Sequence, residues 1–430
     1  MPATALPGFR EFYPDDAALR NHIFSAWRTV AARYGFEEYD GPPLEPLELY
    51  TDKSGAEIMG QLYHFEDKGG RAVALRPEMT PTLARMVGAR ASSLMKPIRW
   101  FSIPQLFRYE RPQRGRLREH FQLNMDLIGD TSPLADAEVI AAAVDIQRVL
   151  GLSAKQVCVR VSHRGVIQQL LVSKGIPAEK LSATLTAIDR LEVDADQAVD
   201  WAQKQLTQLG IDGKLAPAVV EVARIRDWAA LERATGASAP GGAVENLLAC
   251  RDALYQMGLE EFVQLDTSIV RGLAYYTGVV FELFDRQHAL RAVCGGGRYD
   301  DLVKQIAGTD VPCVGFGMGD AVLTELLEEA KLVPEAAGRI EVFLVAHSAT
   351  DQPEILRLAH TLRDAGVSVE YALKAPNLRR QFEQAGKRRA RYVAIVGSPE
   401  GGSESVKIRD LASGQEEVVT QGALAARVRS

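Results

Sequence analysis

Hydrophobic and polar residues recur with two different periods, and the period changes along the chain. Residues 15–34 repeat apolar side chains at helical spacing, begin with two aspartates and end before Gly35, which predicts one amphipathic helix. The next segment, YGFEEYDGPPLEPLELY, contains Pro42 and Pro43, which cannot lie inside a regular helix. We therefore expect this segment to be extended and to lie at the edge of a sheet or of a subunit.

Two later segments have the composition of β-strands. Residues from about 97 to 128 and from about 262 to 318 are rich in β-branched and aromatic residues and contain glycine-rich turns, which is typical of an antiparallel sheet. Between them, residues from about 163 to 260 have a mostly helical pattern with few aromatic side chains. These features predict an α+β domain over residues 1–330 that contains a helical insertion.

The pattern changes again after residues 331–339, KLVPEAAGR, which we interpret as a linker. The apolar runs IEVFLVAH, SVEYAL and RYVAIVG alternate with two helical patterns, the first of which closes at Gly366. This β-α-β-α-β order predicts a separate small α/β domain over residues 340–430.

Composition limits the class of protein. The 430 residues are 47% hydrophobic and 25% charged, with a formal net charge of -6, as expected of a globular protein. Such a charge argues against binding nucleic acid by overall charge, although a local basic face could still bind phosphates. No apolar run approaches the roughly 18 residues that span a bilayer, and the first residues lack the pattern of a secretion signal. We therefore expect a cytoplasmic protein with no membrane partner.

The four cysteines, Cys158, Cys250, Cys294 and Cys313, stand singly without a C-x-x-C pair. This spacing indicates neither a disulfide framework nor a zinc site. We expect all four to be buried as small hydrophobic side chains, and we expect no metal held by protein ligands.

The segment FRYERPQRGRLREHF, residues 107–121, concentrates five arginines around a turn at 112–115. Residues 107–111 and 116–128 are predicted to pair as antiparallel strands. Because side chains alternate between the two faces of a strand, Gln122, Asn124 and Asp126 share a polar face and the residues between them an apolar one.

A polar row on a central sheet is costly to bury without partners, so it should line a ligand pocket; a solvated sheet face is the alternative. Arginines bind phosphate oxygens in pairs, which makes a polyphosphate the expected ligand. The chain has no G-x-x-x-x-G-K-[ST] loop, and CGGGRYDD lacks the context of a dinucleotide fingerprint. Side chains, and not a glycine-rich loop, should therefore hold the phosphates.

These motifs resemble the histidyl-tRNA synthetase family of class II aminoacyl-tRNA synthetases, in which FRYERPQRGRLREHF corresponds to motif 2. GFREFYP (8–14), LRPEMT (75–80), VRGLAYYTG (270–278), GGGRYD (295–300) and the C-terminal domain resemble that family in the same order. The resemblance implies a six-stranded antiparallel sheet flanked by helices, a helical insertion that contacts tRNA, and an α/β anticodon-binding domain. It also implies a homodimer with Pro42 at its interface.

The resemblance implies that the chain activates L-histidine with ATP and Mg²⁺ to an adenylate, then transfers the histidyl group to tRNA(His). Arg108 matches the arginine on the α-phosphate, Glu110 the acid on the adenine amino group, and Arg116 an arginine on the outer phosphates. Arg271 matches the arginine that stabilises charge developing on the α-phosphate, so Arg108 and Arg271 are the expected catalytic residues.

The remaining matched residues would bind the amino acid and the tRNA. Those expected at the α-amino end of histidine are Glu78, Thr80 and Gln122, and those around the imidazole are Asp126, Tyr275, Tyr276 and Tyr299. Arg114, at the hairpin tip, would approach the acceptor end of the tRNA. Basic residues of the last domain would contact the anticodon region, with a solvated charged face as the alternative; they are Arg379, Arg380, Lys387, Arg388, Arg389 and Arg391.

Four positions depart from the family pattern. Val322 stands where motif 3 has an ATP-binding arginine, Ala274 replaces an aspartate, Met79 a glycine, and Asp126 the glutamate of many bacterial members. The motif 2 arginines and Arg271 are expected to compensate for Val322. The main rival is the catalytically silent, synthetase-like regulatory subunit of ATP phosphoribosyltransferase, which lacks the anticodon domain. A class II synthetase for another amino acid would not explain VRGLAYYTG followed by GGGRYD.

Overall fold

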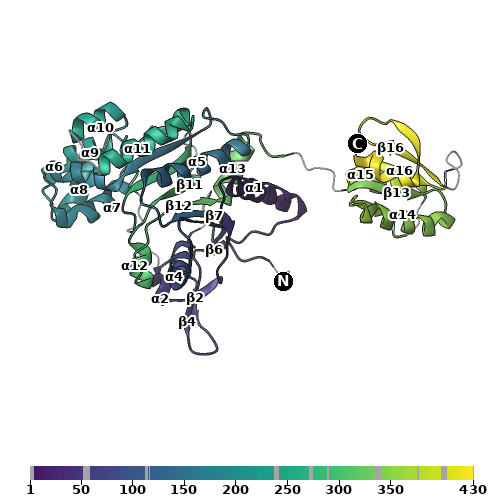
Figure 1. Cartoon of the computed structure of the whole chain (residues 1–430), viewed down its shortest axis with the longest axis horizontal. Helices are drawn as coiled ribbons and strands as arrows, with labels where there is room; N and C mark the ends of the chain where they lie inside the picture. The colour runs from purple at the N-terminus through teal and green to yellow at the C-terminus, as the bar shows by residue number, and fades with distance from the viewer. Residues whose placement is uncertain are drawn as a thin grey trace. The chain divides into compact units, whose positions relative to one another are not determined.

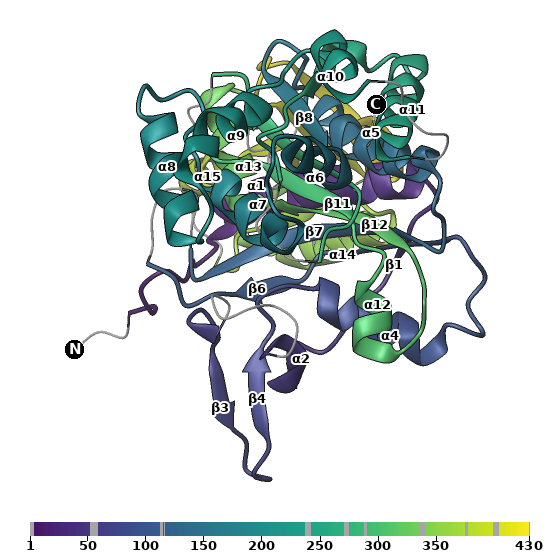
Figure 2. The same ribbon diagram turned by 90° about the vertical axis from the view of Figure 1, so that its left-hand side faces the viewer.

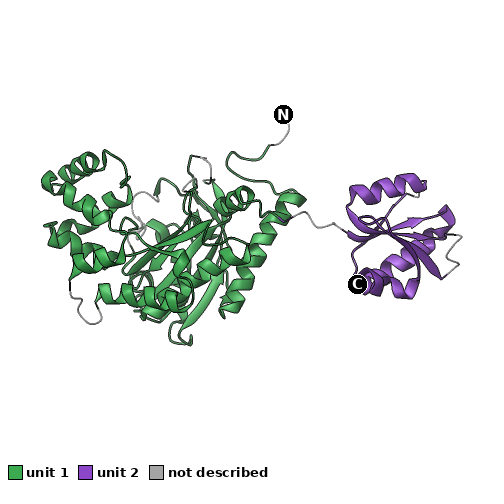
Figure 3. Ribbon diagram, turned by 90° about the horizontal axis from the view of Figure 1, so that it is seen from above, with its two compact units in different colours: residues 1–333 green, residues 334–430 purple. Residues whose placement is uncertain are grey.

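The structure is a computed structural model of the chain, and it describes residues 4–51, 59–111, 115, 117–236, 242–270, 275–287, 290–334, 340–374, 377–398 and 404–429. These residues fall into two compact units, Met1–Val333 and Pro334–Ser430, which Figure 3 shows in separate colours.

The larger unit is built on one sheet. Along the sheet the order is β1 (Glu37–Glu38), β5 (Ile98–Ser102), β7 (Glu119–Ile128), β12 (Cys313–Gly319), β11 (Cys294–Arg298), β10 (Val279–Asp285), β8 (Val157–His163) and β9 (Val263–Leu265), with β6 (Gln105–Phe107) also paired to β7. From β5 to β8 all neighbours are antiparallel, which confirms the predicted fold class, although the sheet has nine strands in the described part of the chain and not the six expected. The outer strands β1 and β9 lie in segments predicted to be extended, but they pair in parallel, which was not predicted, because two or three residues are too few to show a pairing pattern.

One face of this sheet is apolar and is covered by α1 (Pro14–Arg33), α5 (Pro133–Val149) and α13 (Asp320–Glu329). Leu123, Met125 and Leu127 of β7 lie in this core, as the alternation along that strand predicts. Helix α1 confirms the predicted helix: a proline and two aspartates occupy its first turn, and Gly35 follows its end at a φ of +71°.

Helices α4 (Thr80–Arg90) and α12 (Leu302–Ala307) pack against each other on the opposite side, in a second core with Tyr275, Tyr276 and Tyr299. Beside α4 lie α2 (Glu48–Thr51) and a small sheet of order β2 (Leu44–Pro46), β4 (Ala72–Leu75) and β3 (His64–Glu66). Figure 2 shows the β3–β4 ribbon extending away from the main sheet. The segment that contains Pro42 and Pro43 joins β1 to β2, each an edge strand of its sheet, as its sequence predicts.

Six helices follow β8, and Figure 1 shows α6 to α10 grouped together at one end of the unit. They are α6 (Arg164–Ser173), α7 (Leu181–Asp189), α8 (Ala198–Gln208), α9 (Ala216–Ala223), α10 (Trp228–Thr235) and α11 (Ala243–Gln256). None of the helices in the described part of the chain is long and apolar enough to cross a membrane.

The smaller unit begins with β13 (Ile340–Ala346), α14 (Gln352–Asp364), β14 (Val369–Tyr371), α15 (Leu378–Lys387) and β15 (Ala390–Val396). Its three strands are parallel, which confirms the predicted β-α-β-α-β order. Two antiparallel strands, β16 (Ser405–Asp410) and β17 (Glu416–Thr420), and a last helix, α16 (Gln421–Arg429), complete the unit.

Candidate active site

The polar face of the large sheet lies where β7 meets β12. In the register of these strands Asp126 pairs with Gly315, Asn124 with Gly317, and Gln122 with Gly319. On the next strand Gly297 pairs with Gly315 and Gly295 with Gly317. Because directly opposed residues point to the same face, the polar side chains stand beside a floor of bare backbone.

Three site residues lie close across this glycine floor. A methyl carbon added at Gly315 would lie 1.8 Å from Asp126 Oδ1, and one added at Gly317 would lie 2.5 Å from Gln122 Nε2. At Gly297 it would lie 3.0 Å from a ring carbon of Tyr276. Only glycine leaves room for these side chains, so the floor and the polar residues form one arrangement.

Asp126 is the most strongly perturbed acid on this face. The residue is 4% exposed, and its carboxyl group accepts a hydrogen bond from the Tyr299 hydroxyl at 2.5 Å. Burial raises the pKa of Asp126 to about 7, against the lowering effect of that hydrogen bond. Burial and the nearby Asp126 charge also raise the pKa of Tyr299. Near neutral pH this carboxyl group can therefore exist in both forms and can accept a hydrogen bond from a ring N–H.

A second carboxyl group is connected to the same aromatic cluster. Glu78, just before α4, is buried and accepts a hydrogen bond from the Tyr275 hydroxyl at 3.3 Å. The Tyr275 ring contacts those of Tyr276 and Tyr299, with centroids 5.0 and 5.9 Å apart. Thr80, the first residue of α4, is partly buried. The structure thus brings Glu78, Asp126 and the three tyrosines together around two carboxyl groups, while Gln122 lies on the same polar face beside Asn124.

The expected ATP-binding residues are described only in part. Arg108 follows β6, and its Nε donates to the Pro77 carbonyl at 2.9 Å, next to Glu78. Glu110 is partly buried two residues further on. Arg114, Arg116 and Arg271, together with the departure at Ala274, lie outside the described residues.

The motif 3 departure has a structural explanation. Val322 is 9% exposed and belongs to the main core. The tip of the motif 2 segment rests on the same helix, since the Gly115 amide donates to Glu325 Oε1 at 3.0 Å and a methyl carbon added at Gly115 would lie 3.1 Å from Val322 Cγ2. Packing against the motif 2 segment therefore occupies the position that an arginine has in the family pattern.

Sequence reasoning missed several residues of this face. The alternating glycines of VGFGMG indicate this face in the sequence, because a glycine at every second position leaves one face of a strand without side chains. Asn124 lies on the polar face predicted by the alternation along β7, but no motif marks it as a site residue; its Oδ1 accepts from Gln122 Nε2 at 2.8 Å. Tyr39 and Ser102, which also face this side, carry no motif.

In the smaller unit the basic residues of α15 are exposed. Arg379 donates to Glu383 at 3.1 Å and Arg388 pairs with Glu370 at 3.0 Å. Arg380 and Lys387 lie seven residues apart, two helical turns, on one exposed side of the helix. This arrangement is compatible with either a nucleic-acid contact or a solvated charged face.

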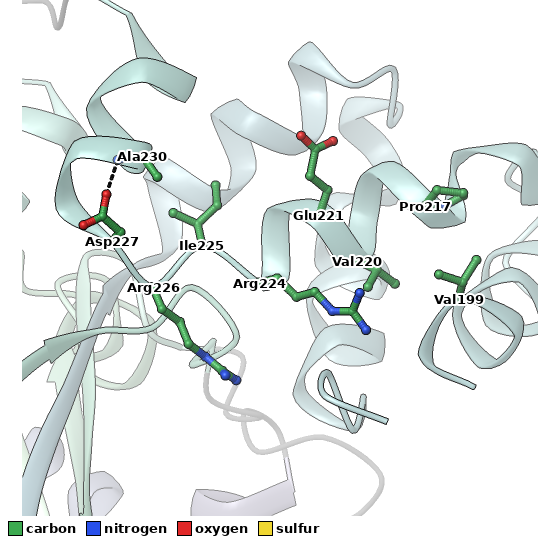
Figure 4. A pocket seen from close by; sticks show the side chains of 9 residues that line it. All are labelled: Val199, Pro217, Val220, Glu221, Arg224, Ile225, Arg226, Asp227 and Ala230. Carbon is green, nitrogen blue, oxygen red and sulfur yellow. Dashed lines mark hydrogen bonds between the residues drawn. The ribbon is translucent and has the colours of Figure 1, made fainter. Parts of the chain in front are cut away.

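A cavity of about 680 Å³ lies among α8, α9 and α10, and Figure 4 shows its lining. Its charged residues have structural partners: Arg226 pairs with Asp194 at 2.9 Å, Glu221 with Lys174 at 3.0 Å, and Asp227 caps α10 by accepting from the Ala230 amide at 2.7 Å. Arg224 donates to the Val193 carbonyl at 2.9 Å. The charged residues that line the cavity are therefore accounted for by contacts within the insertion.

All four cysteines are buried and free, as predicted. Within the described ranges, no group of three or more histidine, cysteine, aspartate or glutamate side chains is placed to hold a metal ion.

The antiparallel sheet with its polar face, its helical insertion and the C-terminal α/β unit define a class II aminoacyl-tRNA synthetase. A family model described as histidyl-tRNA synthetase matches residues 8–323, and one described as anticodon binding domain matches residues 341–430. The chain belongs to the histidyl-tRNA synthetase family.

Relatives and solved structures agree with this assignment. The chain is 44% identical to a histidine–tRNA ligase of Opitutus terrae, over 99% of this chain and 98% of the relative. A crystal structure of histidyl-tRNA synthetase from Nostoc sp. PCC 7120 superposes with a TM-score of 0.84 at 25% identity, covering 100% of this chain and 99% of the other. A Bacillus halodurans structure titled as ATP phosphoribosyltransferase regulatory subunit/histidyl-tRNA synthetase superposes at 0.72 with 20% identity, covering 90% and 97%; that likeness concerns the fold alone.

Proposed function

We propose that this synthetase is a histidine–tRNA ligase, which activates L-histidine with ATP to histidyl-adenylate and transfers the histidyl group to the 3′ end of tRNA(His). The observation that carries the proposal is the aromatic cluster linking Glu78–Tyr275 to Asp126–Tyr299, in a chain of this family. The cluster supplies a carboxylate for a cationic amine and a separate acceptor for a ring N–H.

Within this proposal Glu78, Thr80 and Gln122 bind the α-amino end of histidine, and Asp126 binds the imidazole N–H. Tyr275, Tyr276 and Tyr299 enclose the ring and fix the two carboxyl groups. A site that hydrogen-bonds a substrate group rejects analogues lacking that group by about 10⁴- to 10⁵-fold. Such a site needs no editing reaction, which supports a tRNA-contacting role for the insertion.

The nucleotide would be bound by Arg108, Glu110, Arg116 and Arg271. Arg108 is the residue of this set whose side-chain contact supports the role, because its bond to the Pro77 carbonyl places the guanidinium beside the segment that carries Glu78. ATP enters as its magnesium complex, in which phosphate oxygens bind the ion. Arg271 and Arg108 are the proposed catalytic residues, acting on charge that develops at the α-phosphate.

The tRNA would contact Arg114 at the hairpin tip, and α15 and its C-terminal end through Arg379, Arg380, Lys387 and Arg388. The exposure of these α15 residues supports this role. We further propose a cytoplasmic homodimer, with Pro42 at the interface between subunits. Pro42 lies exposed beside edge strand β2, which supports that position.

Pyrophosphate exchange with each of the twenty amino acids, followed by charging of tRNA transcripts, tests the function. We expect exchange with histidine alone and charging of tRNA(His) alone. Exchange with no amino acid would reject the ligase and favour the regulatory alternative.

A further inference from the structure

Two hydroxyl groups on the polar face have no hydrogen-bond partner within the described part of the chain. They are those of Tyr39 and Ser102, and both oxygen atoms are buried. Ser102, the last residue of β5, is 0% exposed, and the Tyr39 ring, just after β1, is partly buried. Buried polar groups without partners are rare in native proteins, and a bound ligand is one way to satisfy them.

The sheet register places both hydroxyls near Asp126. On neighbouring strands Trp100 pairs with Asp126 and Ser102 with Asn124, so Ser102 points to the face that carries the site. The Tyr39 ring lies against the Trp100 ring, with centroids 5.4 Å apart. Burial and the charge of Asp126 raise the pKa of Tyr39, which agrees with a hydroxyl directed toward that carboxyl group.

Tyr39 and Ser102 do not satisfy each other. The Ser102 hydroxyl acts to lower the pKa of Tyr39 against the larger effect of burial, but the two oxygens do not meet in hydrogen-bond geometry. Tyr299 already donates to Oδ1 of Asp126. Two hydroxyl donors and one carboxyl acceptor are therefore gathered at one end of the polar face.

We propose that Tyr39 and Ser102 determine specificity for histidine: the Tyr39 hydroxyl donates to the imidazole nitrogen that carries no proton, and the neighbouring Ser102 hydroxyl donates to Tyr39 once that contact forms. This inference rests on the proposed function. Neutral imidazole has one N–H donor and one bare nitrogen acceptor. Asp126 accepts from the first and Tyr39 donates to the second, so side chains that offer only one of these groups are rejected.

The variant Y39F tests this contact. The KM for histidine in pyrophosphate exchange should rise about tenfold, while kcat and the KM for ATP stay within about twofold. The midpoint of thermal unfolding should not fall, because the variant removes a polar atom that has no partner in the free protein.

Tyr34 offers a matched control five residues away. Its hydroxyl donates to Asp145 Oδ2 at 2.7 Å, so Y34F should lower the unfolding midpoint and leave the KM for histidine unchanged. The two Tyr→Phe variants should thus separate binding from stability in opposite ways.

Analogues identify the ring atom. Each isomer of pyrrolylalanine keeps one ring N–H and replaces the other nitrogen by carbon. The wild-type chain should strongly prefer histidine over both. One isomer keeps the N–H that contacts Asp126. In Y39F the preference for histidine over that isomer should fall about tenfold, because without the Tyr39 hydroxyl the site no longer distinguishes a ring nitrogen from a carbon.

The outcomes are distinct. If the wild-type chain activates histidine but Y39F and S102A leave its KM unchanged, the inference is wrong and the proposed function stands. A rise in the KM of both substrates with a lower unfolding midpoint indicates a structural role and also overturns it. If the wild-type chain does not activate histidine, the proposed function itself fails. Should Y39F not fold, S102A carries the test, with an expected rise of about threefold in the histidine KM.

Discussion

The carboxyl group of Asp126 couples proton binding to both stability and the proposed substrate contact. Its pKa is raised from 3.8 to about 7 in the folded chain. Between pH 3.8 and about 7 the native state therefore keeps a proton on Asp126 that the unfolded state has released. The contribution of this group to the free energy of unfolding is complete below pH 4 and is lost as the pH rises through 7.

We predict that histidine affinity increases as the pH rises through 7, because the ionised carboxylate is the better acceptor for a ring N–H. The D126N variant should lose this part of the profile, bind histidine at least about tenfold more weakly, and show a smaller fall in unfolding free energy between pH 4 and 7. The first measurement is the KM for histidine from pH 6 to 8.5. The second is the free energy of urea unfolding from pH 4 to 7.

The histidine substrate also titrates near pH 6.5, but it does so identically with both chains, so the difference between the two profiles isolates Asp126. Tyr39, Tyr299 and Cys313, which surround this carboxyl group, have their pKa values raised well above the window. An unchanged profile in D126N would contradict the assignment.

At this scale the motifs predicted which side chains meet. Glu78, Asp126 and the three tyrosines come from separate segments, and the structure places them around one cluster. The role proposed for Tyr39 and Ser102 could not be predicted from the sequence, because neither residue belongs to a motif. Only the fold shows that their hydroxyl groups are buried without a hydrogen-bond partner.

The strand β12 positions Asp126 by having no side chain of its own at Gly315. We predict that G315A displaces the carboxyl group, because the new carbon would lie 1.8 Å from Asp126 Oδ1 and 2.9 Å from the Met125 carbonyl. A misplacement on this scale should cost about 10²-fold in kcat/KM for histidine, measured by pyrophosphate exchange.

Gly319, on the same strand and face, is the matched control. A methyl carbon there would lie no closer than 3.9 Å to His120, an ordinary contact, so G319A should leave exchange within about twofold. Equal losses in the two variants would mean that general damage to the strand, and not the position of Asp126, explains the effect.

Elements were predictable in proportion to their length. Strand β7 has ten residues, enough for its alternation to predict both faces and, through them, the site. Strands β1 and β9 have two and three residues and exist because neighbouring strands provide hydrogen-bond partners. Val322 packs beside Gly115, more than two hundred positions earlier, so local pattern could not predict this contact.

At the scale of the whole molecule, the division into two compact units predicts that activation and tRNA binding can be impaired separately. The double variant R380E/K387E reverses two exposed charges on α15. It should raise the KM for tRNA about tenfold or more. The slope of log binding constant against log salt concentration should become shallower by about two. Pyrophosphate exchange, which needs no tRNA, should be unaffected.

The R357E variant serves as control, because Arg357 is an exposed arginine on α14 that pairs with Glu354 of its own helix. Its charging kinetics should remain close to wild type. If R357E weakens tRNA binding as much as R380E/K387E does, overall charge and not the α15 face governs the interaction.

The glycine floor sets a limit on redesigning this enzyme for other amino acids. A bulkier substrate ring is usually accommodated by trimming the residues beneath it, but Gly297, Gly315 and Gly317 leave nothing to trim. Extra room would have to come from the walls of the proposed histidine site, which are formed by Asp126, Tyr39 and the tyrosine cluster of Tyr275, Tyr276 and Tyr299. Selection for altered amino-acid use should therefore accumulate changes at these wall positions while β11 and β12 keep their sequence.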